Sequence, residues 1–283
     1  MDIKLIGVVG AGQMGQGIAQ VAAQSGFSVL IADQNIITSN QGVEKVRARL
    51  VKAVEKQKIT SDQMQKTMSA LKGVNTLAEL KDCDLVIEAV SENMELKKKI
   101  WRELDSNVKA SALFATNTSS ISITELAAAT KRPSQFAGMH FMNPVPVMEL
   151  VEGIRAIQTS KETFSAIRAA AEKMGKTFVE ARDIPGFAVN RILMPMINEA
   201  VFALYEGIAS AEDIDTAMRL GTNQPMGPLT LADFIGLDTC LAIMEVLHDG
   251  MADSKYRPCP LLKQYVAAGW LGKKSGRGFY VYG

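Results

Sequence analysis

The chain has 283 residues, of which 47% are hydrophobic and 22% charged, and its formal net charge is +1. This balance disfavours a general nucleic-acid or membrane-surface binder, because both would carry a strong basic excess. The three cysteines (Cys83, Cys240 and Cys259) are far apart and lack metal-ligand spacing, and no apolar run approaches the ~20 residues needed to span a bilayer. With no signal-peptide pattern at the N-terminus, we expect a cytoplasmic, metal-free protein of two domains or one large one.

The N-terminal segment predicts a dinucleotide site. An apolar run over residues 5–9 indicates a buried strand, and a helix follows directly after the turn Gly10-Ala11-Gly12-Gln13-Met14-Gly15. Gly10 permits the tight turn, Gly12 lets the backbone approach a pyrophosphate, and Gly15 lets the helix pack closely on the strand. The helix N-terminus presents N–H groups and a positive dipole end to the phosphates. The alternative is a strand–turn–helix whose glycines serve packing alone.

The next strand, residues 27–32, ends at Asp33. A carboxylate there can accept hydrogen bonds from both ribose hydroxyls of the adenosine half, and it would repel the 2′-phosphate of NADP. Gln34 and Asn35 follow it, with no arginine to bind that phosphate. The sequence therefore predicts NAD as the cofactor.

Apolar strands and helical stretches alternate over the first ~180 residues, a pattern typical of a parallel α/β sheet. A helical hairpin is predicted between strands, from a long helix over residues 38–58 and a second, capped at residues 60–62, that runs through residue 68. Further strands are expected at residues 84–90, 113–116, 136–141, 148–151 and 177–181, with helices at 94–108, 123–129 and 161–174 between them. We predict a mostly parallel, Rossmann-type NAD-binding domain over residues 1–183.

The pattern changes at Asp183. No strand-like alternation recurs until residues 278–282, and residues 186–206 are apolar on most sides, which predicts a buried helix kinked at Pro195. Four more helices are expected at residues 211–220, 229–235, 237–247 and 260–268. The sequence therefore predicts an α/β domain followed by an all-α C-terminal domain over residues 184–283.

His140 is the best candidate acid or base. It lies near the end of a predicted strand, and the carboxyl ends of parallel strands are where open α/β sheets bind ligands. Histidine side chains ordinarily titrate near neutral pH, which suits proton exchange with an alcohol. Glu149 or Glu152 on the next strand could pair with the imidazole and fix its tautomer, and spacing alone does not choose between them.

Three further groups have both a functional and a structural interpretation. Asn117-Thr118-Ser119-Ser120 follows a strand and could supply hydroxyl donors to a substrate oxygen or cap the next helix. Asn190 lies on an apolar helix, so its amide faces a cleft or bonds between domains. Lys52 and Lys56 share one helix face, close to Lys45 and Arg49, and either grip the phosphates of a large acidic substrate or form a solvated surface.

Together these residues give the chain a full-length resemblance to the short-chain 3-hydroxyacyl-CoA dehydrogenases, most of all the bacterial 3-hydroxybutyryl-CoA dehydrogenases. The resemblance rests on six motifs whose order and spacing are specific. They are Gly10-Ala11-Gly12-Gln13-Met14-Gly15-Gln16-Gly17-Ile18-Ala19, Glu88-Ala89-Val90-Ser91-Glu92-Asn93, Asn117-Thr118-Ser119-Ser120, Gly138-Met139-His140-Phe141-Met142-Asn143-Pro144, Pro185-Gly186-Phe187-Ala188-Val189-Asn190-Arg191 and Gly227-Pro228-Leu229.

The resemblance implies specific roles. His140 would be the base, Glu152 the carboxylate that orients it, Ser119 a hydrogen-bond partner of the substrate's C3 oxygen, and Asn190 an amide completing the polar pocket. Lys52 and Lys56 would hold the CoA moiety. The implied NAD contacts are Asp33, Glu92, Lys97, Asn117, Asn143 and Lys274.

The implied reaction interconverts (S)-3-hydroxybutyryl-CoA and acetoacetyl-CoA with NAD, in short-chain fatty acid or butyrate metabolism. The resemblance also implies a homodimer formed through the helical domain. Two alternatives remain: a dehydrogenase of small free 3-hydroxyacids, and a non-catalytic NAD-binding protein of the same fold.

Overall fold

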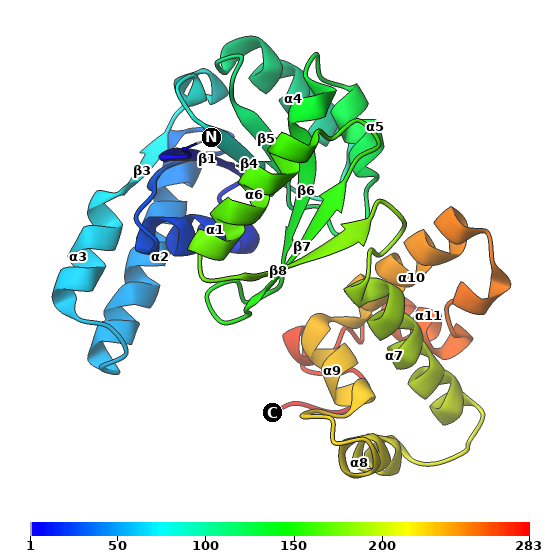
Figure 1. The fold of residues 1–283 in the computed structure, drawn as a ribbon. Helices are drawn as coiled ribbons and strands as arrows, with labels where there is room; N and C mark the ends of the chain where they lie inside the picture. The colour runs from blue at the N-terminus through cyan, green and yellow to red at the C-terminus, as the bar shows by residue number, and fades with distance from the viewer. Residues whose placement is uncertain (1) are drawn as a thin grey trace. The chain divides into compact units, whose positions relative to one another are not determined.

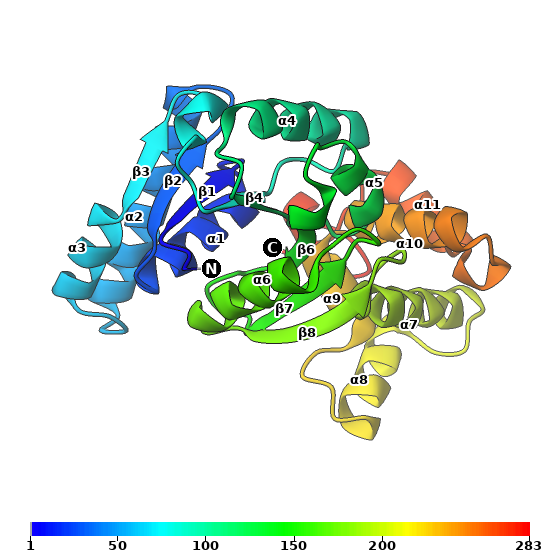
Figure 2. The same cartoon turned by 45° about the horizontal axis from the view of Figure 1, so that its top comes forward.

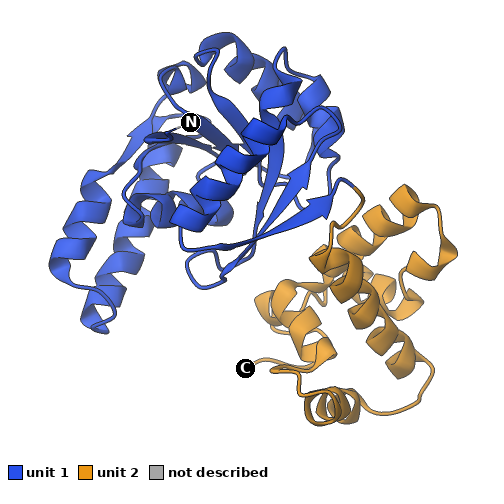
Figure 3. Ribbon diagram, viewed as in Figure 1, with its two compact units in different colours: residues 1–183 blue, residues 184–283 orange. Residues whose placement is uncertain are grey.

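The computed structural model describes residues 2–283 and divides into two compact units, Met1–Asp183 and Ile184–Gly283 (Figure 3). The first is a sheet with helices and the second is built from helices. None of the helices in residues 2–283 is long and apolar enough to cross a membrane.

One eight-stranded sheet forms the centre of the first unit, in the order β3-β2-β1-β4-β5-β6-β7-β8. Neighbouring strands run parallel except β6 and β7, which pair antiparallel. The strands are β1 (Leu5–Val9), β2 (Ser28–Ala32), β3 (Leu71–Val74), β4 (Leu85–Glu88), β5 (Leu113–Thr116), β6 (Phe136–Phe141), β7 (Leu150–Arg155) and β8 (Thr177–Arg182). The prediction of a mostly parallel Rossmann-type sheet is confirmed.

Helices cover both faces of this sheet, whose central strands β1, β4, β5 and β6 are buried on both sides. The helices of the first unit are α1 (Gln13–Gln24), α2 (Ile36–Glu55), α3 (Ser61–Ser69), α4 (Met94–Asn107), α5 (Ile123–Ala128) and α6 (Lys161–Lys173). Apolar residues of α1, α2 and α6 share one core with the sheet. Figure 2 shows α4 on the opposite side from α6. There Trp101 of α4 packs on Phe114 and Phe136, with ring centroids 4.9 and 4.7 Å apart.

The predicted helical hairpin consists of α2 and α3, which lie side by side at one end of the sheet (Figures 1 and 2). The Asn35 side chain caps α2 by accepting from the N–H groups of Ile37 and Thr38. Thr60 and Gln63 form a capping box at the start of α3. These caps fix where the two helices begin, at residues 36 and 61.

Two strands differ from the sequence prediction. β3 was missed, because its four residues include an exposed lysine and a glycine and lie at the sheet edge, where the β pattern is weak. β7 begins at Leu150 rather than 148 and continues to Arg155. The earlier residues turn instead, because the N–H groups of Val147 and Met148 both donate to the carbonyl of Pro144.

The second unit has its own apolar core, formed by α7 (Val189–Tyr205), α8 (Ala211–Gly221), α9 (Pro228–Ile235), α10 (Leu237–Met251) and α11 (Pro260–Ala267). The helix predicted from residue 186 begins at Val189, since Gly186 and Phe187 have φ values of +75° and +48°. It continues through Pro195. Its burial is one-sided rather than complete, and Ile192 is 71% exposed.

The strand-like pattern at residues 278–282 does not form a strand. Only isolated bridges occur there, pairing Arg277 with Gly272 and Val281. The N–H groups of Phe279 and Tyr280 donate to the buried carboxylate of Asp233 instead, at 3.0 Å each. A side chain thus takes the place of a partner strand.

Candidate active site

The glycine-rich turn between β1 and α1 has the shape that a pyrophosphate requires. Gly10 has a φ of +103°, and a Cβ there would lie 2.6 Å from the carbonyl oxygen of Ala89. A Cβ on Gly15 would overlap the carbonyl of Gly10, so α1 packs closely only with glycine at this position. Gly12 is exposed and a Cβ on it would meet no heavy atom within 4 Å. Approach to the N-terminus of α1 is therefore open, and no side chain caps it.

Asp33, directly after β2, lies against this turn. Its Oδ2 accepts from the N–H of Ala11 at 2.5 Å and its Oδ1 from the N–H of Gln34 at 2.7 Å. These bonds hold the half-buried carboxylate beside the glycine turn, where it suits the ribose hydroxyls of a dinucleotide. The turn and Asp33 together fit NAD.

The loop after β6 approaches the same turn. The Gln13 amide donates to Oδ1 of Asn143 at 3.0 Å, which joins the N-terminus of α1 to this loop. The buried Lys176 ammonium donates to the carbonyls of Val145 and Met148, at 2.7 Å each. Two elements distant in sequence thus hold the loop that carries Asn143.

His140 lies near the end of β6, and its Nδ1 is 2.8 Å from Oε2 of Glu152. The antiparallel register pairs His140 directly with Glu152, and residues that face each other across such a pair have adjacent side chains. The His140 side chain is 9% exposed and that of Glu152 1%. Glu149, the other candidate, is exposed in the segment before β7. Of the two carboxylates, the register brings Glu152 to the imidazole.

The segment after β5 has a role other than capping. The Ser122 hydroxyl and the Asp183 carboxylate cap α5, by accepting from backbone N–H groups of its first turn. Ser119 instead binds Glu92, through its N–H at 2.6 Å and its hydroxyl at 3.1 Å. Thr118 donates to the same carboxylate at 2.9 Å. The structural alternative, in which this segment caps the helix, is wrong.

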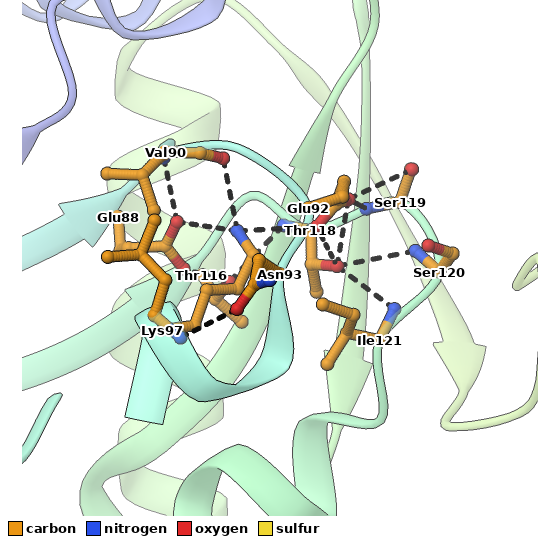
Figure 4. Close-up of polar contacts among 11 residues, drawn as sticks. Glu88, Val90, Glu92, Asn93, Lys97, Thr116, Thr118, Ser119, Ser120 and Ile121 are labelled. Atoms are coloured by element: carbon orange, nitrogen blue, oxygen red, sulfur yellow. Dashed lines mark hydrogen bonds and ion pairs between the residues drawn. The ribbon is translucent and has the colours of Figure 1, made fainter. Parts of the chain in front are cut away.

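Lys97 and Glu88 form a buried ion pair beside this carboxylate (Figure 4). The Lys97 ammonium lies 2.6 Å from Oε1 of Glu88 and 3.3 Å from Oε2 of Glu92. The Lys97 and Glu88 side chains are 1% and 0% exposed. In this structure Lys97 therefore contacts Glu92 and the end of β4, and is shielded from solvent. Sequence reasoning did not give Glu88 a role.

Asn117 links the ends of two strands. Its N–H donates to the carbonyl of Glu88 at the end of β4, and its side-chain oxygen accepts from the N–H of Phe141 at 2.8 Å. Asn117 is 9% exposed. The ends of β4, β5 and β6 are thereby fixed to one another at the edge that carries the glycine turn.

A cavity of about 490 Å³ lies between α1, α2, the α2–α3 connection and the loop after β6. Arg49, Lys58 and Gln20 line it, while Lys52 and Lys56 are exposed on α2 and are not among its lining residues. Nε of Arg49 donates to Gln20, whereas its buried Nη2 has no protein partner. Burial lowers the pKa of Arg49. The sequence did not predict this cavity, although the basic residues on α2 indicated this region of the molecule.

Asn190 and Lys274 belong to the second unit. Asn190 is 9% exposed in the first turn of α7. The Lys274 ammonium lies 2.6 Å from the Asp238 carboxylate of α10. The first unit itself brings together the glycine turn, Asp33, the segment that carries Ser119, and the His140–Glu152 pair.

This arrangement combines the requirements of a dehydrogenase. A dinucleotide turn, a histidine paired with a buried carboxylate, and a serine hydroxyl all lie at the carboxyl ends of parallel strands of one sheet, the edge where such sheets bind ligands. Models of one known protein family match both units of the chain. Residues 5–184 match the 3-hydroxyacyl-CoA dehydrogenase NAD binding domain, and residues 186–282 match the C-terminal domain of the same family.

Individual relatives match over the full length. A probable 3-hydroxybutyryl-CoA dehydrogenase of Bacillus subtilis is 56% identical over 282 residues, which cover 100% of this chain and 98% of that protein. The 3-hydroxybutyryl-CoA dehydrogenase of Bradyrhizobium diazoefficiens is 55% identical over 280 residues, 99% of this chain and 96% of that one. The crystal structure of (S)-3-hydroxybutyryl-CoA dehydrogenase from Ralstonia eutropha matches with a TM-score of 0.97 and 50% identity, covering 100% of both chains. The chain therefore belongs to the 3-hydroxyacyl-CoA dehydrogenase family and is an NAD-dependent enzyme.

Proposed function

We propose that the protein interconverts (S)-3-hydroxybutyryl-CoA and acetoacetyl-CoA, with His140 as the acid and base. The observation that carries the proposal is the 2.8 Å contact between His140 and the buried Glu152, at the sheet edge that also carries the glycine turn. Full-length relatives named 3-hydroxybutyryl-CoA dehydrogenase support the choice of substrate.

The chain's own residues supply the proton chemistry. When bound, NAD would supply the acceptor for the hydride that leaves C3 of the hydroxyacyl group, and NADH would supply the hydride for reduction of the ketone. His140 removes the hydroxyl proton in oxidation and donates it in reduction. Because Nδ1 is held by Glu152, this transfer falls to Nε2, and the carboxylate stabilises the imidazolium that forms.

Ser119 is proposed as the second partner of the C3 oxygen. Its hydroxyl donates to Glu92 in this structure, and an O–H bond can rotate about Cβ–Oγ to reach another acceptor. Asn190 is proposed to contribute a further amide to substrate binding, as the family resemblance implies.

Cofactor and CoA binding are assigned to different elements. We assign NAD to Gly10, Gly12, Gln13, Met14, Gly15, Asp33, Glu92, Lys97, Asn117, Asn143 and Lys274, with Lys97 acting through Glu92. The CoA moiety is assigned to Lys52 and Lys56. Arg49 is added because its buried Nη2 has no protein partner in the basic cavity of the same helix.

We further propose a homodimer formed through the helical unit. Ile192, Ile208 and Leu220 are 71–75% exposed there, and a second copy of the chain would cover such apolar side chains. We also propose a cytoplasmic location, from the sequence pattern, and a role in butyrate metabolism, from the family resemblance. Sedimentation at micromolar concentration should give twice the chain mass of 30.6 kDa.

The test is His140→Gln, assayed by initial rates of acetoacetyl-CoA reduction with NADH. We expect kcat to fall roughly 10²- to 10⁴-fold, the usual contribution of a positioned acid or base. His248→Gln is the matched control, since His248 is the chain's other histidine and its side chain is 42% exposed. Rates of His140→Gln near those of the control would refute the mechanism. Parallel assays with NADPH test the cofactor preference, and assays with free 3-hydroxybutyrate test the alternative of a dehydrogenase of free hydroxyacids. NAD binding without turnover of either substrate would favour a non-catalytic protein.

A further inference from the structure

The Glu88 carboxylate and the Lys97 ammonium are buried together, and neither takes part in the proton chemistry proposed above. Glu88 ends β4 and is 0% exposed, and Lys97 on α4 is 1% exposed. Burying a charge is costly unless it is paired and hydrogen-bonded, and a buried ion pair is weak evidence for stability alone. The pair therefore calls for an explanation beyond the stability of the fold.

Both Glu88 oxygens are engaged. Oε1 accepts from the Lys97 ammonium at 2.6 Å and from the N–H of Val90 at 2.8 Å, and Oε2 accepts from the Thr116 hydroxyl at 2.7 Å. Glu88 thus binds the ammonium from one side and the end of β5 from the other. This arrangement leaves the ammonium little freedom to move.

Lys97 uses its remaining contacts on the loop that follows β4. Its Nζ lies 3.3 Å from the Val90 carbonyl and 3.3 Å from Oε2 of Glu92. The ammonium thus donates hydrogen bonds to Glu88 and to the Val90 carbonyl, and it forms an ion pair with Glu92. The Glu92 side chain is 39% exposed, and the ion pair with the buried ammonium holds it from the side of β4.

Glu92 in turn holds Ser119. It accepts from the Ser119 N–H at 2.6 Å, from the Ser119 hydroxyl at 3.1 Å and from the Thr118 hydroxyl at 2.9 Å. Figure 4 shows the resulting chain of contacts, which runs from Glu88 through Lys97 and Glu92 to Ser119. Its first members are buried, and its last is the residue proposed to bind the C3 oxygen.

We infer that Glu88 is a positioning residue for the reaction: through Lys97 it fixes Glu92, and through Glu92 it fixes the backbone and hydroxyl of Ser119. The inference rests on the proposed function, since Ser119 is assigned there to the C3 oxygen. A misplacement of about 1 Å can cost roughly 100-fold in rate. A network of this kind therefore acts on kcat without touching substrate.

The principal variant is Glu88→Gln, which keeps the side-chain size and removes the charge. Its amide can turn N–H groups toward the Lys97 ammonium, and the ammonium then loses its closest partner. Glu103→Gln is the matched control, because Glu103 lies on the exposed face of α4, the helix that carries Lys97. We expect kcat for acetoacetyl-CoA reduction to fall roughly 10- to 100-fold in Glu88→Gln, with far less change in KM. A kcat equal to that of the control would overturn the inference.

A purely structural role is separated by a double-mutant cycle with Ser119→Ala. If Glu88 acts through Ser119, Glu88→Gln should lower kcat much less in the Ser119→Ala background than in the wild type. Equal losses in the two backgrounds would show that Glu88 acts elsewhere and would refute the proposal. Should Glu88→Gln fail to fold, Thr116→Val removes the hydroxyl that donates to Oε2 at 2.7 Å and that also accepts, at 3.3 Å, from the N–H of Thr118. A several-fold loss of kcat that Thr116→Ser restores is then expected, and no loss would count against the role.

Hydrogen exchange gives a readout that does not depend on the substrate. In the ligand-free protein, the amide of Ser119 should exchange faster in Glu88→Gln than in Glu103→Gln, because its N–H loses its fixed acceptor. Unchanged exchange there overturns the inference, whatever the enzyme acts on. If exchange rises but the wild type does not reduce acetoacetyl-CoA, the proposed function fails while the positioning network stands.

Discussion

Replacing Glu152 by glutamine tests the acid–base pair most directly. Glutamine keeps the size of the side chain and an oxygen that can accept from Nδ1 of His140, so the change removes the charge more than the contact. The site is dry, with Glu152 1% exposed and the His140 side chain 9%. The imidazolium that donates the proton during reduction would then have a neutral partner in place of a carboxylate, and less of the enzyme would hold that proton.

The size of the effect follows from the geometry. Unit charges 2.8 Å apart attract by about 6 kcal/mol at an effective dielectric constant of about 20, which sets a ceiling. A hydrogen bond to a charged group contributes about 1.5–3 kcal/mol net, and each 1.36 kcal/mol is tenfold in rate. We therefore expect Glu152→Gln to lower kcat by about 10- to 150-fold, with KM for acetoacetyl-CoA little changed.

The assay is the initial rate of acetoacetyl-CoA reduction at saturating NADH, with Glu149→Gln as the matched control. Glu149 lies three residues away and is exposed, so the same substitution there should leave kcat near wild type. If both variants lost the same activity, or Glu149→Gln lost more, the assignment of Glu152 to the imidazole would be refuted. Equal melting temperatures of the two variants would exclude unfolding as the cause.

Two further predictions concern binding and stability. Arg49→Gln should raise KM for acetoacetyl-CoA roughly tenfold at unchanged kcat, because a charge-assisted contact made equally in the ground and transition states is lost. Arg47→Gln, on the exposed side of the same helix, is the control and should leave KM unchanged. If both variants raised KM equally, the result would argue against the cavity as a CoA site. For Asp84, burial raises the pKa, but hydrogen bonds from Lys109 and from backbone N–H groups including that of Leu5 outweigh it, so the pKa lies below its usual value. The ionised carboxylate therefore stabilises the fold above about pH 4, and that stabilisation is lost as the pH falls through the lowered pKa. Urea titration should show Asp84→Asn about 2 kcal/mol less stable at pH 7, and a difference that did not narrow below pH 4 would contradict this account.

Local sequence predicted the elements whose signals are strong. The glycine turn, the apolar runs of β5 and β6 and the capped helices follow from residue type and spacing, and their bounds agree with the structure to within a few residues. The C-terminal segment misled the prediction, because its alternating pattern is real but its N–H groups bind the Asp233 carboxylate. A side chain 46 residues away in sequence is a partner that no local pattern reveals.

The choice between Glu149 and Glu152 illustrates a second limit. Both glutamates follow His140 at distances compatible with pairing, and the side-chain alternation of a strand cannot be applied until its first residue is known. The turn at Pro144 delays the start of β7 to Leu150, and the antiparallel register then places Glu152 opposite His140. Register depends on tertiary pairing, so the family resemblance was needed to decide what the local sequence left open.

The burial of Lys97, in contrast, is favoured by the spacing of residues on its helix. Three lysines stand in a row at positions 97–99, and Trp101 follows. Residues three and four apart share a helix face, so Lys97 and Lys98 both lie near Trp101, whereas Lys99 does not. Trp101 and Leu104 mark the side of the helix that packs on the sheet, and both are 0% exposed. Local spacing thus leaves two lysines as candidates for burial, and tertiary pairing with Glu88 at the end of β4 selects Lys97.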